Sequence, residues 1–284
     1  MREVVKTVPL EKLYAFPNHP FKVLDNEEQQ ELTDSIKQYG VISPIIVRPR
    51  EESGYEIISG HRRARACAKA GFTSIPAFIC DMDRETAIIT LVDSNLHREH
   101  ILPSEKAYAY KLKLDAIKSQ GKRNDLTSRQ LVGKLESADF VGLEASESGR
   151  QVQRYIRLTE LIPPILEMVD NGQIAFSPAV ELSYLTKEEQ ADLLETMQSE
   201  VATPSLSQAQ RMKKLSVQGK LDMDTIFGIM TEEKANQKEQ VKLKKDNIKG
   251  FFPKGYTTQQ MEHVIMKLLG DWQRKRERSR NEAR

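Results

Sequence analysis

The fold follows from one stretch of sequence, Ile57-Ile58-Ser59-Gly60-His61-Arg62-Arg63-Ala64-Arg65-Ala66. Its apolar start is typical of a buried strand, its second half is typical of a helix, and Gly60 permits a tight turn between them. The first amide groups of a helix have no intrahelical partners, and the helix dipole favours an anion there. Guanidinium groups suit phosphate oxygens. The residues alone favour a phosphate-binding turn and an ordinary solvated basic helix about equally.

Strands and helices alternate on both sides of this turn within the first hundred residues. Asp25 or Asn26 can cap a helix that ends at Gly40. Short apolar runs bracketed by proline, glycine or serine predict strands. The predicted strands are 44–49, 55–59 and 75–80, and the further helices are 62–70 and 84–99. This alternation predicts an α+β domain over residues 1–100.

The remainder of the chain carries helical patterns and no convincing strand. Helices are predicted from Ser104 to Gly121, from Thr127, and from Gly149 to Leu161. The predicted units are an all-α helix-turn-helix domain at 101–215, a lysine-rich linker or helix at 216–250, and a small helical unit at 251–284. In the last unit, Thr257 and Gln260 form a capping box ahead of an apolar stripe that suits a dimer seam.

Composition excludes several classes of protein. The 43 basic and 41 acidic residues nearly cancel, so a polyanion site requires a local cluster of basic side chains. Two cysteines provide no disulfide framework, which predicts a cytoplasmic protein. No apolar run approaches the ~20 residues that span a bilayer, so we expect no membrane partner.

Four segments, in order, resemble the sequence boxes of the ParB family of plasmid and chromosome partition proteins. They are Asn18-His19-Pro20, Gly40-Val41-Ile42-Ser43-Pro44-Ile45-Ile46-Val47-Arg48, Gly60-His61-Arg62-Arg63-Ala64-Arg65-Ala66, and Asn95-Leu96-His97-Arg98-Glu99 followed by Pro103. The resemblance covers roughly residues 5–215. It implies a ParB/sulfiredoxin-like N-terminal domain, which in this family binds CTP with Mg²⁺ and closes a dimer into a clamp on DNA.

The resemblance also implies site residues. The nucleotide-binding positions are Gly60, His61, Arg62, Arg63, Asn95 and Arg98. Gly60, Arg62 and Arg63 would meet the triphosphate, Asn95 would help to hold the magnesium ion, and Arg98 would support the pocket.

Three departures from the family pattern bear on catalysis. The family has a glutamate, tied to CTP hydrolysis, where this chain has His61, and a second glutamate where it has Ser94. An arginine of the first box is replaced by Phe21-Lys22, and Asp93 is one residue away from the missing carboxylate. His61 is therefore the one catalytic candidate, and CTP hydrolysis is expected to be weak at most.

Two segments open like the helices of a helix-turn-helix, Leu126–Val132 and Ser148–Leu158. The predicted DNA contacts are Arg129, Gln130, Ser148, Arg150, Gln151, Arg154 and Arg157. Bases would be met near the start of the second helix, whereas Arg154 and Arg157 suit phosphate contacts or structural roles. The intervening stretch, 135–147, is longer than a usual turn and predicts an extra turn or wing.

The leading functional hypothesis is therefore a ParB-like protein that binds double-stranded DNA for partition of a plasmid, chromosome or mobile element, gated by CTP. Its expected partners are a second copy of the chain and a ParA-type ATPase, and its expected location is the nucleoid or a plasmid. Two alternatives remain open. One is a nucleotide-independent transcriptional regulator, and the other is a phosphoryl-transfer enzyme on the same fold.

Overall fold

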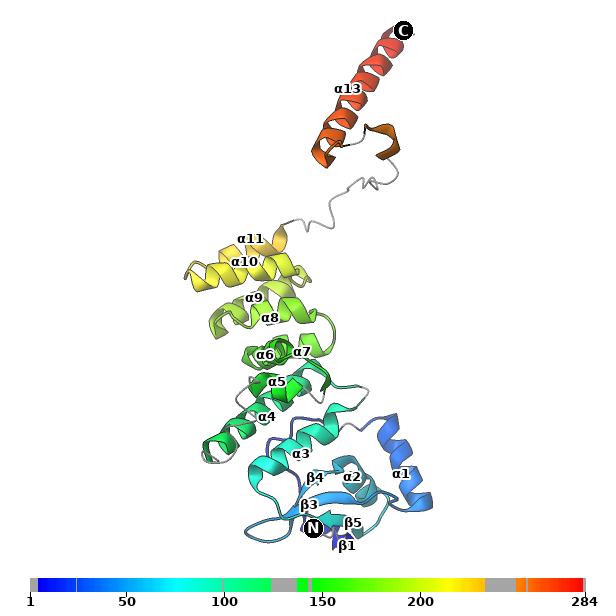
Figure 1. Ribbon diagram of the computed structural model, residues 1–284, viewed down its shortest axis with the longest axis vertical. Coiled ribbons are helices and arrows are strands. Elements are labelled where there is room, and N and C mark those ends of the chain that lie inside the picture. Colours follow the sequence, from blue (N-terminus) through cyan, green and yellow to red (C-terminus); the bar gives the residue numbers. More distant parts are fainter. Residues whose placement is uncertain are drawn as a thin grey trace. The chain divides into compact units, whose positions relative to one another are not determined.

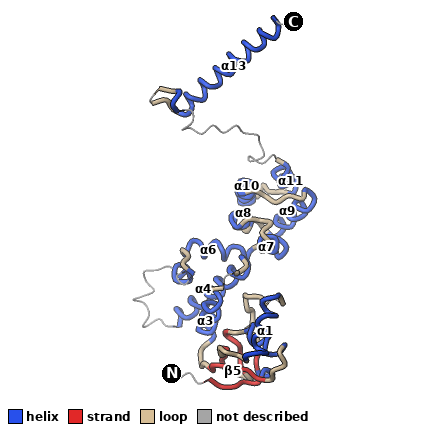
Figure 2. Tube along the Cα trace, turned by 90° about the vertical axis from the view of Figure 1, so that its right-hand side faces the viewer, coloured by secondary structure: helices blue, strands red, loops and turns tan. Residues whose placement is uncertain are grey.

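The computed structural model describes residues 5–23, 25–98, 100–123, 137–142, 145–232, 249–253 and 255–282. The chain divides into one compact unit at 1–232 and a second at 233–284 (Figure 1). The first unit begins with a sheet and continues as a succession of helices (Figure 2). The predicted order, an α+β domain followed by helices, is confirmed. A helix long and apolar enough to cross a lipid bilayer does not occur among the described residues.

Five strands form one mixed sheet in the order β1-β5-β3-β4-β2. They are β1 (Val5–Pro9), β2 (Leu13–Tyr14), β3 (Ile45–Pro49), β4 (Tyr55–Ser59) and β5 (Ser74–Ile79). β3 runs parallel to β5 and antiparallel to β4, and β1 closes the far edge against β5. The three predicted strands are confirmed. β1 and β2 were not predicted, because three of the five side chains of β1 are exposed and β2 has only two residues.

Helices α1 (Glu27–Tyr39) and α2 (His61–Lys69) pack together beside the sheet. The Asn26 side chain caps α1 by accepting a hydrogen bond from the Gln29 amide at 3.1 Å, and Gly40 ends the helix with a positive φ of 72°. The buried Gln29 side chain donates to the carbonyl of Arg62 at 3.0 Å. α1 is therefore fastened to the first turn of α2.

Helices α3 (Arg84–Leu96) and α4 (Pro103–Arg123) connect the sheet to the helical region. Their interface buries Leu91 and Tyr110 completely. Lys113 of α4 is 1% exposed and forms an ion pair with Asp93 of α3. α4 continues two residues beyond Gly121, where the glycine predicted its end.

The start of α4 is held from both sides. The Glu105 carboxylate, 7% exposed, accepts hydrogen bonds from the amides of Lys22 at 2.7 Å and Leu102 at 3.2 Å. The adjacent Ser104, 6% exposed, donates from its amide at 2.9 Å and its hydroxyl at 2.6 Å to the Asp170 carboxylate. This junction therefore joins the N-terminal domain to the helices that follow.

Seven further helices follow in the described part of the first unit. They are α5 (Ser137–Gly142), α6 (Gly149–Arg157), α7 (Pro163–Asp170), α8 (Phe176–Leu182), α9 (Lys187–Glu200), α10 (Leu206–Val217) and α11 (Met223–Thr231). The last five share a core that includes Ile165, Leu182 and Met212, whereas Ala138 and Val152 of the first two belong to the core that contains Leu91 and Tyr110. Short 3₁₀ segments occur at Leu10–Lys12, Leu158–Glu160 and Lys249–Phe251. α11 lies within the range predicted as a lysine-rich linker or helix, and its Ile226 belongs to the core that contains Ile165.

The second unit contains the helix α13 (Thr258–Glu282). The predicted capping box is confirmed, because the Thr257 amide donates to Gln260 Oε1 at 2.8 Å and the Gln260 amide donates to Thr257 Oγ1 at 3.3 Å. Of the predicted apolar stripe, Met261 is buried, whereas Leu268 and Trp272 are more than half exposed.

The buried ion pair between Lys113 and Asp93 generates a prediction about stability. Lys113→Ala would leave the partly buried carboxylate without this partner, and we expect it to lower the free energy of unfolding by about 2–4 kcal/mol. Lys111→Ala on the same helix removes an exposed pair with Glu160 and should cost less than about 1 kcal/mol. Urea unfolding of both variants measures the difference. Equal losses of unfolding free energy in the two variants would show that the buried pair stabilises the fold no more than the exposed pair does.

Candidate functional site

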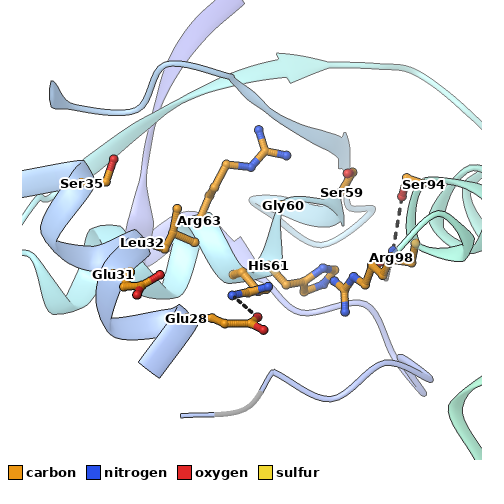
Figure 3. A pocket seen from close by; sticks show the side chains of 12 residues that line it. Glu28, Glu31, Leu32, Ser35, Ser59, Gly60, His61, Arg63, Ser94 and Arg98 are labelled. Atoms are coloured by element: carbon orange, nitrogen blue, oxygen red, sulfur yellow. Dashed lines mark hydrogen bonds and ion pairs between the residues drawn. The ribbon is translucent and has the colours of Figure 1, made fainter. Parts of the chain in front are cut away.

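A cavity of about 560 Å³ lies at the turn between β4 and α2. It is lined by α1 on one side and by the end of α3 on the other (Figure 3). All six predicted nucleotide-binding residues line it: Gly60, His61, Arg62, Arg63, Asn95 and Arg98. A second cavity of about 650 Å³ shares Glu28, Arg62 and Arg98 with the first and extends towards the start of α4.

The turn at Gly60 requires a glycine. Its φ is 102°, and a Cβ atom there would come within 2.5 Å of Ile45 Cγ2 on β3. Strand β4 therefore passes directly into α2, and the amide groups of the first turn of α2 are available to an anion at the cavity.

Arg62 and Arg98 supply positive charge to the cavity. Arg62 pairs with Glu28 at 3.1 Å and donates to Gln29 at 3.3 Å, yet a third of its side chain remains exposed. The Arg98 guanidinium lies 5.4 Å from the centre of the Phe21 ring. Burial and the charge of Arg62 lower the pKa of Arg98. An anion between the two arginines would relieve their mutual repulsion.

Two other arginines of the motif are held by the protein itself. Arg63 donates to the backbone carbonyls of Ser43 at 2.5 Å and Pro44 at 2.8 Å. Arg65 donates to the carbonyl of Val23 at 3.0 Å and pairs with Asp25 at 3.2 Å. Arg63 therefore anchors the segment before β3 while it lines the cavity, and its contact with phosphate remains a prediction.

His61 lies against a second histidine, His19, and the sequence did not predict this contact. The rings of His61 and His19 are 4.1 Å apart and tilted by 59°. Burial, followed by the proximity of His19 and Arg98, lowers the pKa of His61 to about 3. His61 is therefore neutral at pH 7, and it is a weak base.

Asn95 is the residue that the family resemblance assigned to magnesium. Its side-chain nitrogen donates to the Leu91 carbonyl at 2.7 Å and to Ser94 Oγ at 3.3 Å, which leaves the side-chain oxygen for the cavity. Asp93 is committed to the ion pair with Lys113. In the described part of the chain, no group of three or more histidine, cysteine, aspartate or glutamate side chains could hold a metal ion.

Two cavity residues, Glu28 and Glu31 on α1, were not predicted as part of the site. Their spacing of three residues on a solvated helix is typical of an ordinary polar surface. Only the packing of α1 on α2 brings them to the cavity wall, where Figure 3 shows them across from Arg98.

The predicted DNA-reading helix is α6. Ser148 caps it by accepting from the Gln151 amide at 3.3 Å, and Arg150 and Gln153 are exposed. Arg154 donates to Gln151 Oε1 at 3.1 Å and to Ser177 Oγ at 2.9 Å, and Arg157 donates to the backbone and side chain of Ser183. Both arginines tie α6 to α8. Arg129 and Gln130 lie outside the described residues.

The start of α6 is fixed by the segment before it. The Gly149 amide donates to Asp139 Oδ1 on α5 at 2.7 Å, and a Cβ on Gly142 would collide with the Glu147 carbonyl at 2.2 Å. Glu147 accepts a hydrogen bond at 3.0 Å from the fully buried Tyr110 hydroxyl of α4. α5 is therefore the predicted extra turn, and it has the form of a short helix.

Comparison with known proteins identifies relatives of this chain. Residues 1–96 match the family model described as the ParB N-terminal domain. The chain is 34% identical over 186 residues to the chromosome-partitioning protein Spo0J of Thermus thermophilus, which covers 65% of this chain and 62% of that relative. It is 35% identical over 199 residues to the nucleoid occlusion protein of Listeria innocua, which covers 68% of this chain and 63% of that relative. The chain thus spans less than two thirds of the length of these relatives.

One similar solved structure is the C-terminally truncated chromosome-partitioning protein ParB from Caulobacter crescentus complexed with CTP-gamma-S. It shares 21% sequence identity and a TM-score of 0.32, and the comparison covers 68% of this chain and 98% of that one.

The lowered pKa of His61 generates a prediction about pH. The unfolded chain would protonate this histidine near its ordinary pKa of 6.5, whereas the folded chain resists protonation down to about pH 3. The stabilising contribution is therefore complete above pH 6.5 and is lost as the pH falls below it, by roughly 1 kcal/mol per pH unit. His61→Gln should flatten the dependence of unfolding free energy on pH between 6.5 and 4, measured by urea titration. The control is His97→Gln, at an exposed position. An unchanged slope in His61→Gln would contradict the burial of a neutral imidazole.

Proposed function

Because residues 1–96 of this chain belong to the ParB N-terminal domain family, we propose that the protein is a CTP-gated, ParB-type DNA-binding protein serving partition of a chromosome, plasmid or mobile element. One observation carries the proposal. The fold gathers all six motif residues around a single cavity, and the helical region that follows the domain carries the candidate reading helix α6. The relatives named for chromosome partition and nucleoid occlusion support the same reading.

The nucleotide's phosphates are the part that the cavity suits best. Arg62 and Arg98 provide charge-assisted donors, and the first amides of α2 provide neutral ones. Gly60 lets the backbone approach a phosphate closely. The resemblance to ParB proteins, rather than the cavity wall, identifies the nucleotide as CTP.

Gating requires that the cavity and the DNA-binding helices communicate. His19 contacts His61 in the cavity wall, and the segment that follows His19 is bonded to Glu105 at the start of α4. Tyr110 of α4 in turn donates a hydrogen bond to Glu147, which lies just before the start of α6. A nucleotide that shifts the cavity wall would therefore act on the same elements that position α6.

DNA is the proposed macromolecular ligand, read by Ser148, Arg150 and Gln151. Arg154 and Arg157 have internal partners, so their role in this proposal is to position the helix. A second copy of the chain and a ParA-type ATPase are the further proposed partners, with the exposed apolar stripe of α13 as the seam between copies. The proposed location is the nucleoid or a plasmid.

The residues of the cavity favour CTP binding over CTP hydrolysis and over direct coordination of magnesium. A histidine with a pKa of about 3 is a weak general base. Magnesium usually takes one or two carboxylates together with substrate phosphates, and the residues beside Asn95 offer no free carboxylate. The donor set beside Asn95 therefore does not fit a magnesium ion, and the carboxylates that line the cavity, Glu28 and Glu31, lie on α1.

Calorimetric titration of the purified protein with CTP, ATP, GTP and UTP, with and without DNA, tests the proposal. Selective CTP binding is expected. Sequence-specific DNA binding by a protein that binds none of the four nucleotides would favour the nucleotide-independent regulator, and selective ATP binding would favour the phosphoryl-transfer enzyme.

Arg62→Ala should weaken CTP binding about 10- to 100-fold, because it removes a charge-assisted contact worth about 1.5–3 kcal/mol. Recognition of an isolated DNA site should persist. Arg65→Ala on the same helix is the matched control, since Arg65 bonds to Val23 and Asp25. Equal CTP affinity of wild type and Arg62→Ala would remove this cavity from the proposal.

Arg150→Ala should abolish preference for a DNA site selected by the wild-type protein, at a cost of about 1–3 kcal/mol for a bidentate base contact. Gln153→Ala, an exposed neighbour outside the predicted contact set, is the control. Fluorescence anisotropy with the selected and a scrambled duplex measures the preference. Unchanged discrimination in Arg150→Ala would show that α6 does not present this side chain to the bases.

A further inference from the structure

Two buried polar atoms, one in the cavity wall and one directly behind it, have unmet hydrogen-bonding capacity. Among the described residues, the buried side-chain nitrogen and oxygen atoms without a partner are His19 Nε2 and His61 Nε2. Leaving such an atom unsatisfied costs about 1–3 kcal/mol. The two rings are in contact, although the structure contains no hydrogen bond between the two Nε2 atoms. A rotation of the rings that aimed a proton on one Nε2 at the lone pair of the other would satisfy both atoms.

The backbone beside His19 decides which ring donates. His19 Nδ1 lies 2.7 Å from the Phe21 carbonyl oxygen, which can only accept a hydrogen bond. Nδ1 of His19 therefore carries the proton, and the longer 3.2 Å approach of the Phe21 amide to the same atom is not a hydrogen bond in this tautomer. His19 Nε2 is then an acceptor, so in a paired arrangement of the two rings His61 would be the donor, from its own Nε2.

The consequence for the cavity is a neutral acceptor at the position where ParB proteins have a glutamate. His61 Nδ1 has no hydrogen-bond partner and is not among the buried unpartnered atoms, so it is open to the cavity that His61 lines. In the tautomer that a hydrogen bond to His19 would favour, Nδ1 of the neutral His61 ring presents a lone pair without charge. It can accept a hydrogen bond from a ligand or a water, but it supplies no negative charge to a cation.

Among the described residues that line the cavity, the carboxylates are Glu28 and Glu31, and both lie on α1 rather than beside His61 and Asn95. Ser94 stands at the second glutamate position, and Asp93 is paired with Lys113 of α4. Across the cavity, Glu28 is paired with Arg62. Arg62 and Arg98 thus dominate the charge where the phosphates would lie.

We propose that this pocket binds the polyphosphate of its nucleotide without a divalent cation coordinated by the protein. Arg62 and Arg98 neutralise the phosphates, and His19 is a positioning residue that holds His61 neutral with Nδ1 towards the ligand. This inference rests on the nucleotide binding proposed above.

The affinity for CTP with excess Mg²⁺ and with excess EDTA tests the inference on the full chain. Wild type should change less than about threefold between the two conditions. The double variant His61→Glu/Ser94→Glu restores both carboxylates, and it should bind at least about tenfold more tightly with Mg²⁺ than with EDTA, a difference of about 1.4 kcal/mol. Ser35→Glu adds a carboxylate elsewhere on the cavity wall and should not create this dependence.

Each other outcome overturns a defined part of the argument. Loss of CTP binding by the wild-type protein in EDTA would refute the inference. If the Glu31→Gln variant then bound CTP equally with Mg²⁺ and with EDTA, the cation would be assigned to α1. Equal responses to Mg²⁺ in Ser35→Glu and the double variant would refute the assignment of the cation to the family positions. No binding in either condition would overturn the proposed function and this inference together.

The role of His19 has its own readout. Long-range ¹⁵N–¹H spectra of the wild-type protein should show His61 protonated at Nε2 and not at Nδ1. His19→Phe keeps a ring at the position but removes the acceptor, so it should shift His61 towards a mixture of tautomers. A proton on His61 Nδ1 in the wild type would refute the arrangement, whether or not the variant folds.

Discussion

The contact between Gly60 and Ile45 is the constraint on which the site depends. A turn with a φ of 102° that leaves no room for a Cβ forces β4 to pass straight into α2 against β3. Because the turn is fixed, the first residues of α2 face α1 on one side and the end of α3 on the other. The cavity is the space that these three elements leave.

Local patterns predicted the strands around this turn and the helices between them, because apolar alternation and capping residues act over a few positions. They did not predict β1, whose side chains are mostly exposed and whose pairing with β5 spans about seventy residues. The helical form of α5 depends on contacts with Gly149 and α4 that a pattern does not contain. The six motif residues do share one cavity, yet Glu28 and Glu31 became part of it only through helix packing.

The sequence did not distinguish arginines that are available to a ligand from arginines that are bonded within the protein. Arg62 and Arg150 keep exposed guanidinium surface, whereas Arg63 and Arg157 are bonded to backbone carbonyls. The sequence of a basic motif shows which side chains are charged. It does not show which hydrogen-bond acceptors the fold places beside them. For the same reason, His61 could be placed at the site from sequence, whereas the identity of its partner, His19, came only from the structure.

The junction at Ser104 and Glu105 has a mechanical consequence. α4 has 21 residues and is therefore about 30 Å long, while its first turn is clamped between the segment after His19 and the end of α7. A rigid rod clamped at one end is a lever. A tilt of about 10° at the clamp would carry the far end of such a helix through about 5 Å, which is close to one helical turn. Under the proposed function, a small tilt at the cavity end of α4 would therefore become a larger displacement at the other end of the same helix.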